Sequence, residues 1–163
     1  MQSTDKTEET PGETRGPAIN VLTQYVKSLS FGNPGVPKSL GASNEAPHIS
    51  ITVNVRGRSL QNKDFEVDLE LISKATRDKE VIFVAEIVYS GVFRISGVPA
   101  ESLQTLVLVE CPRLLFPFVR NILADLTRYG GYAPLLIDPI DFAELYGRNL
   151  TTHQVSEGSQ SVN

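Results

Sequence analysis

Hydrophobic and polar residues alternate along two stretches in the first half of the chain. Residues 49–56 (ISITVNVR) and 65–71 (FEVDLEL) both place an apolar residue at every second position. A period of two is typical of a β-strand with one buried and one wet face. The link between the stretches is polar and contains Gly57 and Asn62, so the pattern predicts a hairpin.

Three more stretches predict strands. Residues 19–31 alternate in part, and residues 81–89 are apolar on both faces apart from Glu86. A strand that is apolar on both sides is central in a layered fold or part of a subunit interface. Residues 92–95 are expected to form a short strand after a turn at Ser90 and Gly91. The links within residues 49–95 are short, which favours an antiparallel sheet.

The second half of the chain has a helical period. We expect one helix over residues 99–109, broken at Pro112, and a second that starts near Pro117 and stops at Gly130. A last helix is expected to begin at Asp138, with that residue as its N-cap. Strands followed by helices predict an α+β fold, with one sheet and the helices packed on one face.

Between the last two helices lies an unusually apolar loop. Residues 132–137 read YAPLLI, although loops are normally polar because they lie at the surface. Such a loop must cover an apolar surface or bind a partner.

Composition limits the class of protein. The 163 residues allow one domain with a core, and the net charge of −4 argues against nucleic-acid binding. We find no apolar run long enough for a membrane helix and no signal peptide, so a cytoplasmic protein is expected. We expect a disordered tail at 1–17, a domain at 18–150 and a flexible tail at 151–163.

Catalytic chemistry finds little support in the sequence. Cys111 lies in an apolar setting and is expected to be a buried thiol, and Asp138 and Asp141 are explained by helix capping. The spacing of His and Cys residues does not suit a metal site. We therefore expect neither an enzyme nor a metal or cofactor.

Four segments together carry a family resemblance. The run from Cys111 and Pro112 to Arg120 (CPRLLFPFVR) resembles the signature of the SecB family of protein-export chaperones. The segment SFGNPGVP at residues 30–37, YSGVFRISG at 89–97 and the loop and helix start at 132–142 resemble family segments in the same order. The resemblance covers residues 20–150.

The resemblance implies a SecB-like four-stranded antiparallel sheet and a homotetramer, a dimer of dimers. It also implies that the protein holds precursor proteins unfolded and delivers them to the SecA ATPase. A chaperone of the same fold that serves a toxin–antitoxin pair is the alternative, and genomic neighbours would separate the two. A third hypothesis, a ligand-binding protein or enzyme with a pocket at residues 132–142, lacks a polar anchor.

The resemblance also suggests site residues. For a client-binding groove, with the core as the competing interpretation, the candidates are Phe31, Phe116, Tyr132, Leu135, Ile137, Phe142 and Tyr146. For SecA docking the candidates are the period-two carboxylates Glu66, Asp68 and Glu70, together with Val84 and Glu86. Two family acidic positions are Ser28 and Gly32 here. Independently of the resemblance, the apolar strand at residues 81–89 suggests Ala85, Ile87 and Tyr89 as candidates for the subunit interface.

Overall fold

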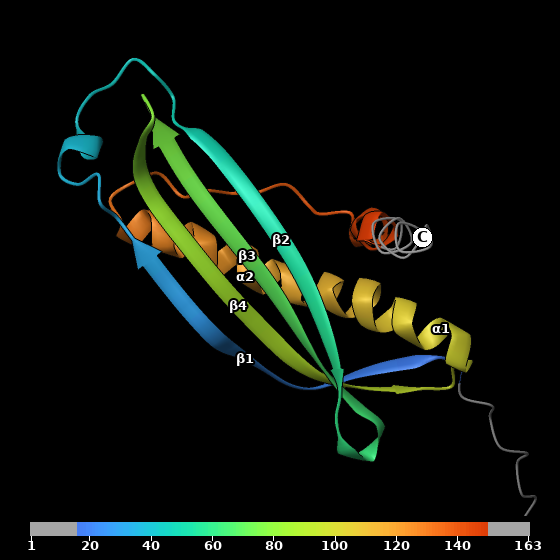
Figure 1. The fold of residues 1–163 in the computed structure, drawn as a ribbon. Helices are drawn as coiled ribbons and strands as arrows, with labels where there is room; N and C mark the ends of the chain where they lie inside the picture. Colours follow the sequence, from blue (N-terminus) through green and yellow to red (C-terminus); the bar gives the residue numbers. More distant parts are fainter. Residues whose placement is uncertain (1–15, 150–163) are drawn as a thin grey trace, which may run out of the picture.

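The computed structural model describes residues 16–149, which form one twisted sheet with helices on one face (Figure 1). The strands are β1 (Ala18–Gly32), β2 (His48–Ser59), β3 (Asp64–Arg77) and β4 (Glu80–Ser96). Their order across the sheet is β1-β4-β3-β2, and all neighbours are antiparallel. The expected four-stranded antiparallel sheet is confirmed. Since β1 and β2 are opposite edges, residues 33–47 form a crossover loop, which contains a short 3-10 helix (Lys38–Leu40).

The two hairpins close with different turns. A 3-10 turn (Gln61–Lys63) joins β2 to β3. Asp78 and Lys79 join β3 to β4 with φ values of 50° and 66°. Two consecutive residues with positive φ are typical of the tight hairpin turn that matches the twist of the flanking strands.

Strand β4 is continuous, so the expected turn at Ser90 and Gly91 is wrong. Both residues pair on each side, Ser90 with Tyr25 and Asp68, and Gly91 with Gln24 and Val67. A Cβ at Gly91 would lie 2.8 Å from the Phe93 ring and 3.1 Å from Leu115. The glycine therefore lets the helix approach the sheet closely.

The helical segments are also continuous. Helix α1 (Ala100–Thr105) passes through a π-helical turn (Leu106–Glu110) into α2 (Cys111–Tyr129). The predicted break at Pro112 and the start near Pro117 are therefore wrong. Cys111 donates its N–H to Leu106, five residues back, and Pro112, which has no N–H to donate, follows this wider turn in the first turn of α2.

Helix α2 ends as predicted at the glycine pair. Gly130 caps it, and Gly131 has a φ of +94°, which favours glycine. An extended loop follows, and the last helix spans residues 142–149. Its N-cap is Asp141, whose Oδ1 accepts the N–H of Glu144 at 3.0 Å, so the assignment of this role to Asp138 is wrong.

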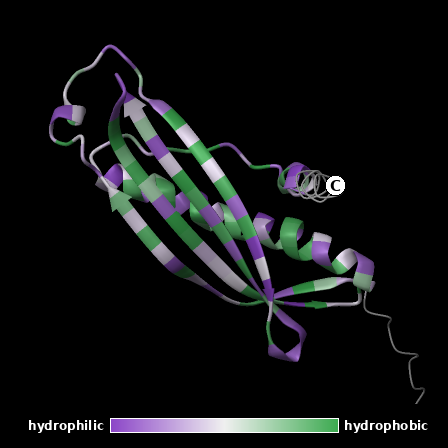
Figure 2. Ribbon diagram, in the orientation of Figure 1, coloured by the Kyte–Doolittle hydropathy of each residue, from purple (hydrophilic) through white to green (hydrophobic). Residues whose placement is uncertain are grey.

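The core lies between α2 and the central strands, along which hydrophobic and hydrophilic residues alternate (Figure 2). The inward residues of β3 and β4, including Leu69 and Leu71, pack against Leu115, Val119 and Leu123 of α2. Ala85 and Ile87 are completely buried here and Tyr89 nearly so. This burial corrects their assignment to a subunit interface: α2 of the same chain already covers them, which explains why this face of β4 is apolar.

The predicted tails lie almost wholly outside the described residues, and only Gly16 and Pro17 of them are included. None of the helices within residues 16–149 is long and apolar enough to cross a membrane.

Candidate functional site

The apolar loop at residues 130–137 is fixed to α2 by hydrogen bonds. The Oγ1 atom of Thr127, which is buried, accepts the N–H of Leu135 at 2.9 Å and donates to the carbonyl of Leu123 or Ala124. Arg120 donates from Nε to the carbonyl of Ile137 at 2.9 Å. Because its backbone is held at these points, the loop forms a defined wall beside α2.

The seven candidate groove residues differ in burial. Ile137 and Phe142 are 8% and 1% exposed, and Phe116 is buried with its ring edge-on to Phe142 at 6.1 Å between centroids. Leu135 and Tyr146 are half-buried against the same core. Their assignment to a client groove stays a prediction. Most of the apolar area of these five side chains already packs against other residues of the same chain.

Phe31 and Tyr132 belong to a second, smaller cluster at the other end of the sheet. The ring of Tyr132 lies 5.3 Å from that of Phe83, which in turn lies 5.8 Å from that of Phe31. Ala75 and Ile82 complete the buried part of this cluster. The structure therefore divides the candidate groove residues between two apolar clusters, with Phe31 and Leu135 in contact with both.

Leu136 is a surface candidate that the sequence analysis missed. Its side chain is 62% exposed and borders a hollow of about 390 Å³ between α2 and the loop. Phe116, Pro117, Arg120 and Pro139 line the same hollow. The signal was present in the run of three apolar residues at 135–137, because an extended backbone turns successive side chains to opposite sides.

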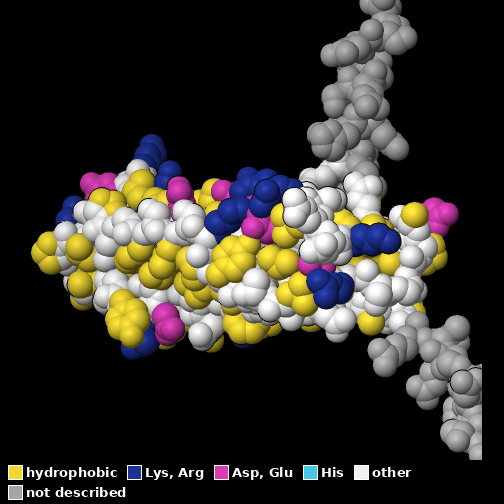
Figure 3. All heavy atoms as spheres, turned by 90° about the horizontal axis from the view of Figure 1, so that it is seen from below, with side chains coloured by type: hydrophobic (Ala, Val, Ile, Leu, Met, Phe, Trp, Pro, Cys, Tyr) yellow, Lys and Arg dark blue, Asp and Glu magenta, His cyan; other side chains and the backbone are white. Residues whose placement is uncertain are grey.

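A second exposed apolar surface lies where β1 extends beyond the cover of α2. Val26 pairs with Tyr89 and Leu29 with Ile87, so both point to the helical side of the sheet, and both are exposed. Leu114 and Phe118, one turn apart on α2, are exposed too, and the Phe118 ring stacks on Tyr89 at 5.6 Å. We call Val26, Leu29, Leu114 and Phe118 the β1–α2 strip. Hydrophobic side chains are spread over much of the face seen in Figure 3.

The opposite face of the sheet carries the predicted row of carboxylates. Glu66, Asp68 and Glu70 lie in phase with Asp64 on β3, and their partners on β4 show that all face away from the core. Each carboxylate forms an ion pair. The pairs are Asp64 with Arg94, Glu66 with Lys27 and Arg58, Asp68 with Lys27, and Glu70 with Arg56. The row is therefore a mixed-charge network and not an unpaired negative ridge.

Hydrogen bonding sets the protonation of this network. A hydrogen bond from Tyr25, then those from Lys27 and Arg58, lower the pKa of Glu66 from its usual 4.5 to about 2. Burial, then the bond to Glu66, raises the pKa of Tyr25 to about 12. Glu66 is therefore firmly ionised and Tyr25 firmly neutral at physiological pH.

Glu86 is the exception on this face. It is exposed on β4 and forms no ion pair with the residues that the structure describes. Ser30 and Ile72 are its cross-strand neighbours, and Val84 and Val88 flank it on the same face, both half-buried. Ser28 and Gly32 pair with Val88 and Val84, so the residues at the two family acidic positions lie around Glu86.

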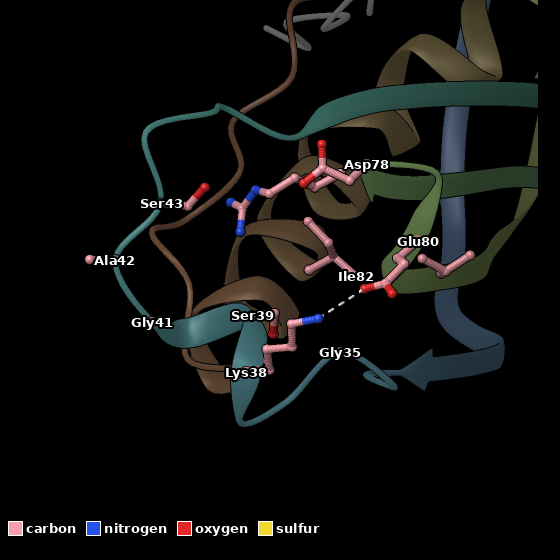
Figure 4. Close-up of a pocket in the computed structure, with 11 residues that line it drawn as sticks. Gly35, Lys38, Ser39, Gly41, Ala42, Ser43, Asp78, Glu80 and Ile82 are labelled. Carbon is pink, nitrogen blue, oxygen red and sulfur yellow. Dashed lines mark ion pairs between the residues drawn. The ribbon is translucent and has the colours of Figure 1, made fainter.

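A polar pocket of about 260 Å³ lies between the crossover loop and the β3–β4 turn (Figure 4). Lys38 faces Glu80 across it at 3.6 Å, and Arg77 and Asp78 also line it. Two positive and two negative side chains balance, so the lining favours neither anions nor cations.

Reactive and metal-binding groups are not assembled in the described part of the chain. Residues 16–149 contain no cluster of three or more His, Cys, Asp or Glu side chains that could hold a metal ion. Cys111 is completely buried, as predicted. Burial, with a smaller contribution from Glu110, raises the pKa of its thiol to about 12, so it is not a nucleophile at neutral pH.

Comparison with known proteins agrees with this arrangement. Residues 12–153 match the family described as SecB, preprotein translocase subunit SecB. The protein-export protein SecB of Mesorhizobium japonicum is 51% identical over 140 residues, which cover 86% of this chain and 84% of the relative. The protein-export protein SecB of Brucella anthropi is 51% identical over 150 residues, which cover 92% of each chain.

A solved structure agrees with the fold. A SecB-like chaperone of Mycobacterium tuberculosis, in complex with a peptide from an antitoxin, superposes with a TM-score of 0.62 at 12% identity. The match covers 75% of this chain and 90% of that chain, and at this identity it speaks for the fold alone. The family match and the two relatives decide the identity: this chain belongs to the SecB family of protein-export chaperones, which are not enzymes.

Proposed function

We propose that the protein holds precursor proteins unfolded in the cytoplasm and delivers them to the SecA ATPase of the translocase. The observation that carries this proposal is the exposed apolar surface of a chain that belongs to the SecB family. Leu136 at the loop leaves a large apolar side chain in water. Such surface is costly to expose unless a partner covers it, and unfolded chains offer apolar side chains that folded proteins bury.

The edge of the sheet at β2 suits an extended client. The outer edge of β2 pairs with no other described strand. An extended polypeptide can add to such an edge through backbone hydrogen bonds, which are independent of sequence, while its side chains contact nearby apolar surface. Both features favour many different clients over a single specific ligand.

SecA docking is proposed for the sheet face away from the helices. Glu86 supports it, because this carboxylate is exposed and unpaired among the described residues and has apolar neighbours. The paired carboxylates Glu66, Asp68 and Glu70 are less available, since a partner would have to compete with Lys27, Arg56 and Arg58. Val84 adds apolar contact beside Glu86.

A homotetramer, built as a dimer of dimers, is proposed as the assembled state. The β1–α2 strip supports it, together with the adjoining free edge of β1. Stable subunit interfaces combine apolar surface with close fit, and the strip offers both aliphatic side chains and the aromatic ring of Phe118. Clients would then bind at the loop surface around Leu136.

Refolding arrest tests the proposed function. An unfolded precursor protein is diluted from denaturant into buffer with or without a stoichiometric amount of the protein, and its refolding is followed by fluorescence. We expect refolding to slow or stop, and the arrested precursor to move into translocase vesicles, where added protease cannot reach it, when SecA and ATP are supplied. Unchanged refolding would overturn the chaperone proposal. Arrest of an antitoxin segment but not of precursors would favour the same-fold alternative.

A further inference from the structure

The crossover loop and the loop at residues 130–137 are joined by side-chain hydrogen bonds. Asn33 donates from Nδ2 to the carbonyl of Gly130 at 2.9 Å. The hydroxyl of Tyr132 lies 2.7 Å from Asn33 Oδ1 and also 2.7 Å from Ser39 Oγ. These contacts link segments that are nearly a hundred residues apart in sequence.

The direction of these hydrogen bonds follows from the number of protons. A tyrosine hydroxyl has one proton, and Asn33 Oδ1 can only accept, so the proton of Tyr132 points to Asn33. Ser39 must then donate to Tyr132. A chain of three hydrogen bonds thus runs from Ser39 through Tyr132 and Asn33 to Gly130, and each side chain in it has a partner.

Close packing surrounds this chain of hydrogen bonds. A Cβ at Gly130 would lie 2.8 Å from the ring of Phe31, and one at Gly131 would lie 2.9 Å from Leu40. The glycine pair therefore ends α2 and also lets the end of β1 and the 3-10 helix of the crossover loop approach the turn. The ring of Tyr132 is held against Phe83, which fixes the position of its hydroxyl.

We propose that Asn33, Ser39 and Tyr132 are positioning residues for client binding, and we call them the latch. The latch holds the loop at 130–137, which carries Leu136, against the crossover loop as one rigid wall. Loops that are already ordered lose less conformational entropy when a client binds, so a held wall binds more tightly than a free one. This inference rests on the proposed chaperone function. It gives the hydroxyl of Tyr132 a role that is separate from the packing of its ring.

Tyr132→Phe tests the latch, because the ring and its contacts remain while the hydroxyl is lost. The affinity for a permanently unfolded client should fall about threefold to tenfold, as expected for the loss of one or two hydrogen bonds, with most of the change in the dissociation rate. The amides of Gly35 and Ser39, which bond to the carbonyls of Ile82 and Gly35, should exchange faster with deuterium. Tyr129→Phe, which removes an exposed hydroxyl from the end of α2, is the matched control and should change neither quantity.

The outcomes separate the latch from the chaperone function. If the wild-type protein binds the client and Tyr132→Phe binds it equally well, the latch has no positioning role, whatever the exchange rates show. If the wild-type protein binds no unfolded client, the proposed function itself fails, and the role of the latch fails with it. Should Tyr132→Phe not fold, Ser39→Ala removes only the first hydrogen bond of the chain, and the same comparison of affinities decides.

Discussion

At the scale of single residues, Glu66 is the centre of a network that spans the sheet. Tyr25 and Lys27 reach it from β1, across β4, and Arg58 reaches it from β2. The spacing of the carboxylates at every second position of the sequence predicted that they form a row on one face of the sheet. It did not predict the partners, because they lie on strands whose order in the sheet is set by the tertiary fold.

This network predicts a dependence of stability on pH. The pKa of Glu66 is lowered to about 2 in the folded state, against 4.5 when unperturbed. A carboxyl group whose pKa is lowered by folding stabilises the folded state at pH values above its pKa in the unfolded chain. This contribution is lost as the pH falls from 4.5 towards 2. Glu66→Gln removes the titrating group, so its melting temperature should fall less steeply over this range than that of the wild type.

Thermal unfolding at several pH values measures this difference. Glu101→Gln is the control, since Glu101 is exposed on α1 and forms no ion pair with the described residues, and its curve should parallel the wild type. Parallel curves for wild type and Glu66→Gln would mean that the network around Glu66 does not stabilise the charged form.

At the scale of elements, the local sequence patterns predicted where the strands lie and which faces are buried better than where each element begins and ends. The alternation in β2 and β3 placed their faces correctly, because burial on one side fixes the period. The predicted turn within β4 was wrong. Ser90 and Gly91 are typical of turns, but here they pair with strands on both sides, and Gly91 lets α2 approach the sheet closely. Pro112 was misjudged for a similar reason, since a π-helical turn precedes it.

The exposed face of β4 gives a prediction for SecA. Glu86→Lys reverses a charge that has no ion-pair partner among the described residues, so SecA affinity should fall while the melting temperature stays close to that of the wild type. Titration of SecA at low and moderate salt measures the effect, which should shrink as salt rises. Glu101→Lys is the matched charge reversal on α1. Equal weakening by both variants would indicate a general charge effect and argue against docking at β4.

At the scale of the whole molecule, the β1–α2 strip predicts assembly. Phe118→Asp places a charge in this strip, so it should yield species smaller than the wild-type assembly, because an unpaired charge in an apolar interface is strongly unfavourable. Light scattering reports the mass against the 17.9 kDa of one chain. Tyr129→Asp, on α2 but outside the strip, should leave the assembly intact. A wild-type protein that is monomeric at micromolar concentration would contradict the proposal.

The overall fold could be predicted from the sequence more readily than the exposure of individual apolar residues. Strands before helices implied one sheet with helices on one face, and the family resemblance supplied the number of strands. The division of apolar residues between core and surface did not follow, because Ile137 and Leu136 are neighbours of equal hydrophobicity with opposite exposure. The hydrogen bonds of Thr127 and Arg120, together with the packing of Ile137 in the core, set which side of the loop faces α2.

The most direct test of the account is therefore to measure client affinity and thermal stability together for Leu136→Ser and Leu135→Ser. Leu136 is exposed, so Leu136→Ser should weaken binding of an unfolded precursor by about five- to thirtyfold, the loss expected for one apolar contact of about 1 to 2 kcal/mol. Its melting temperature should not change. Leu135→Ser should lower the melting temperature, because Leu135 packs against both apolar clusters. Wild-type affinity in the Leu136→Ser protein would contradict the claim that this loop surface holds unfolded chains.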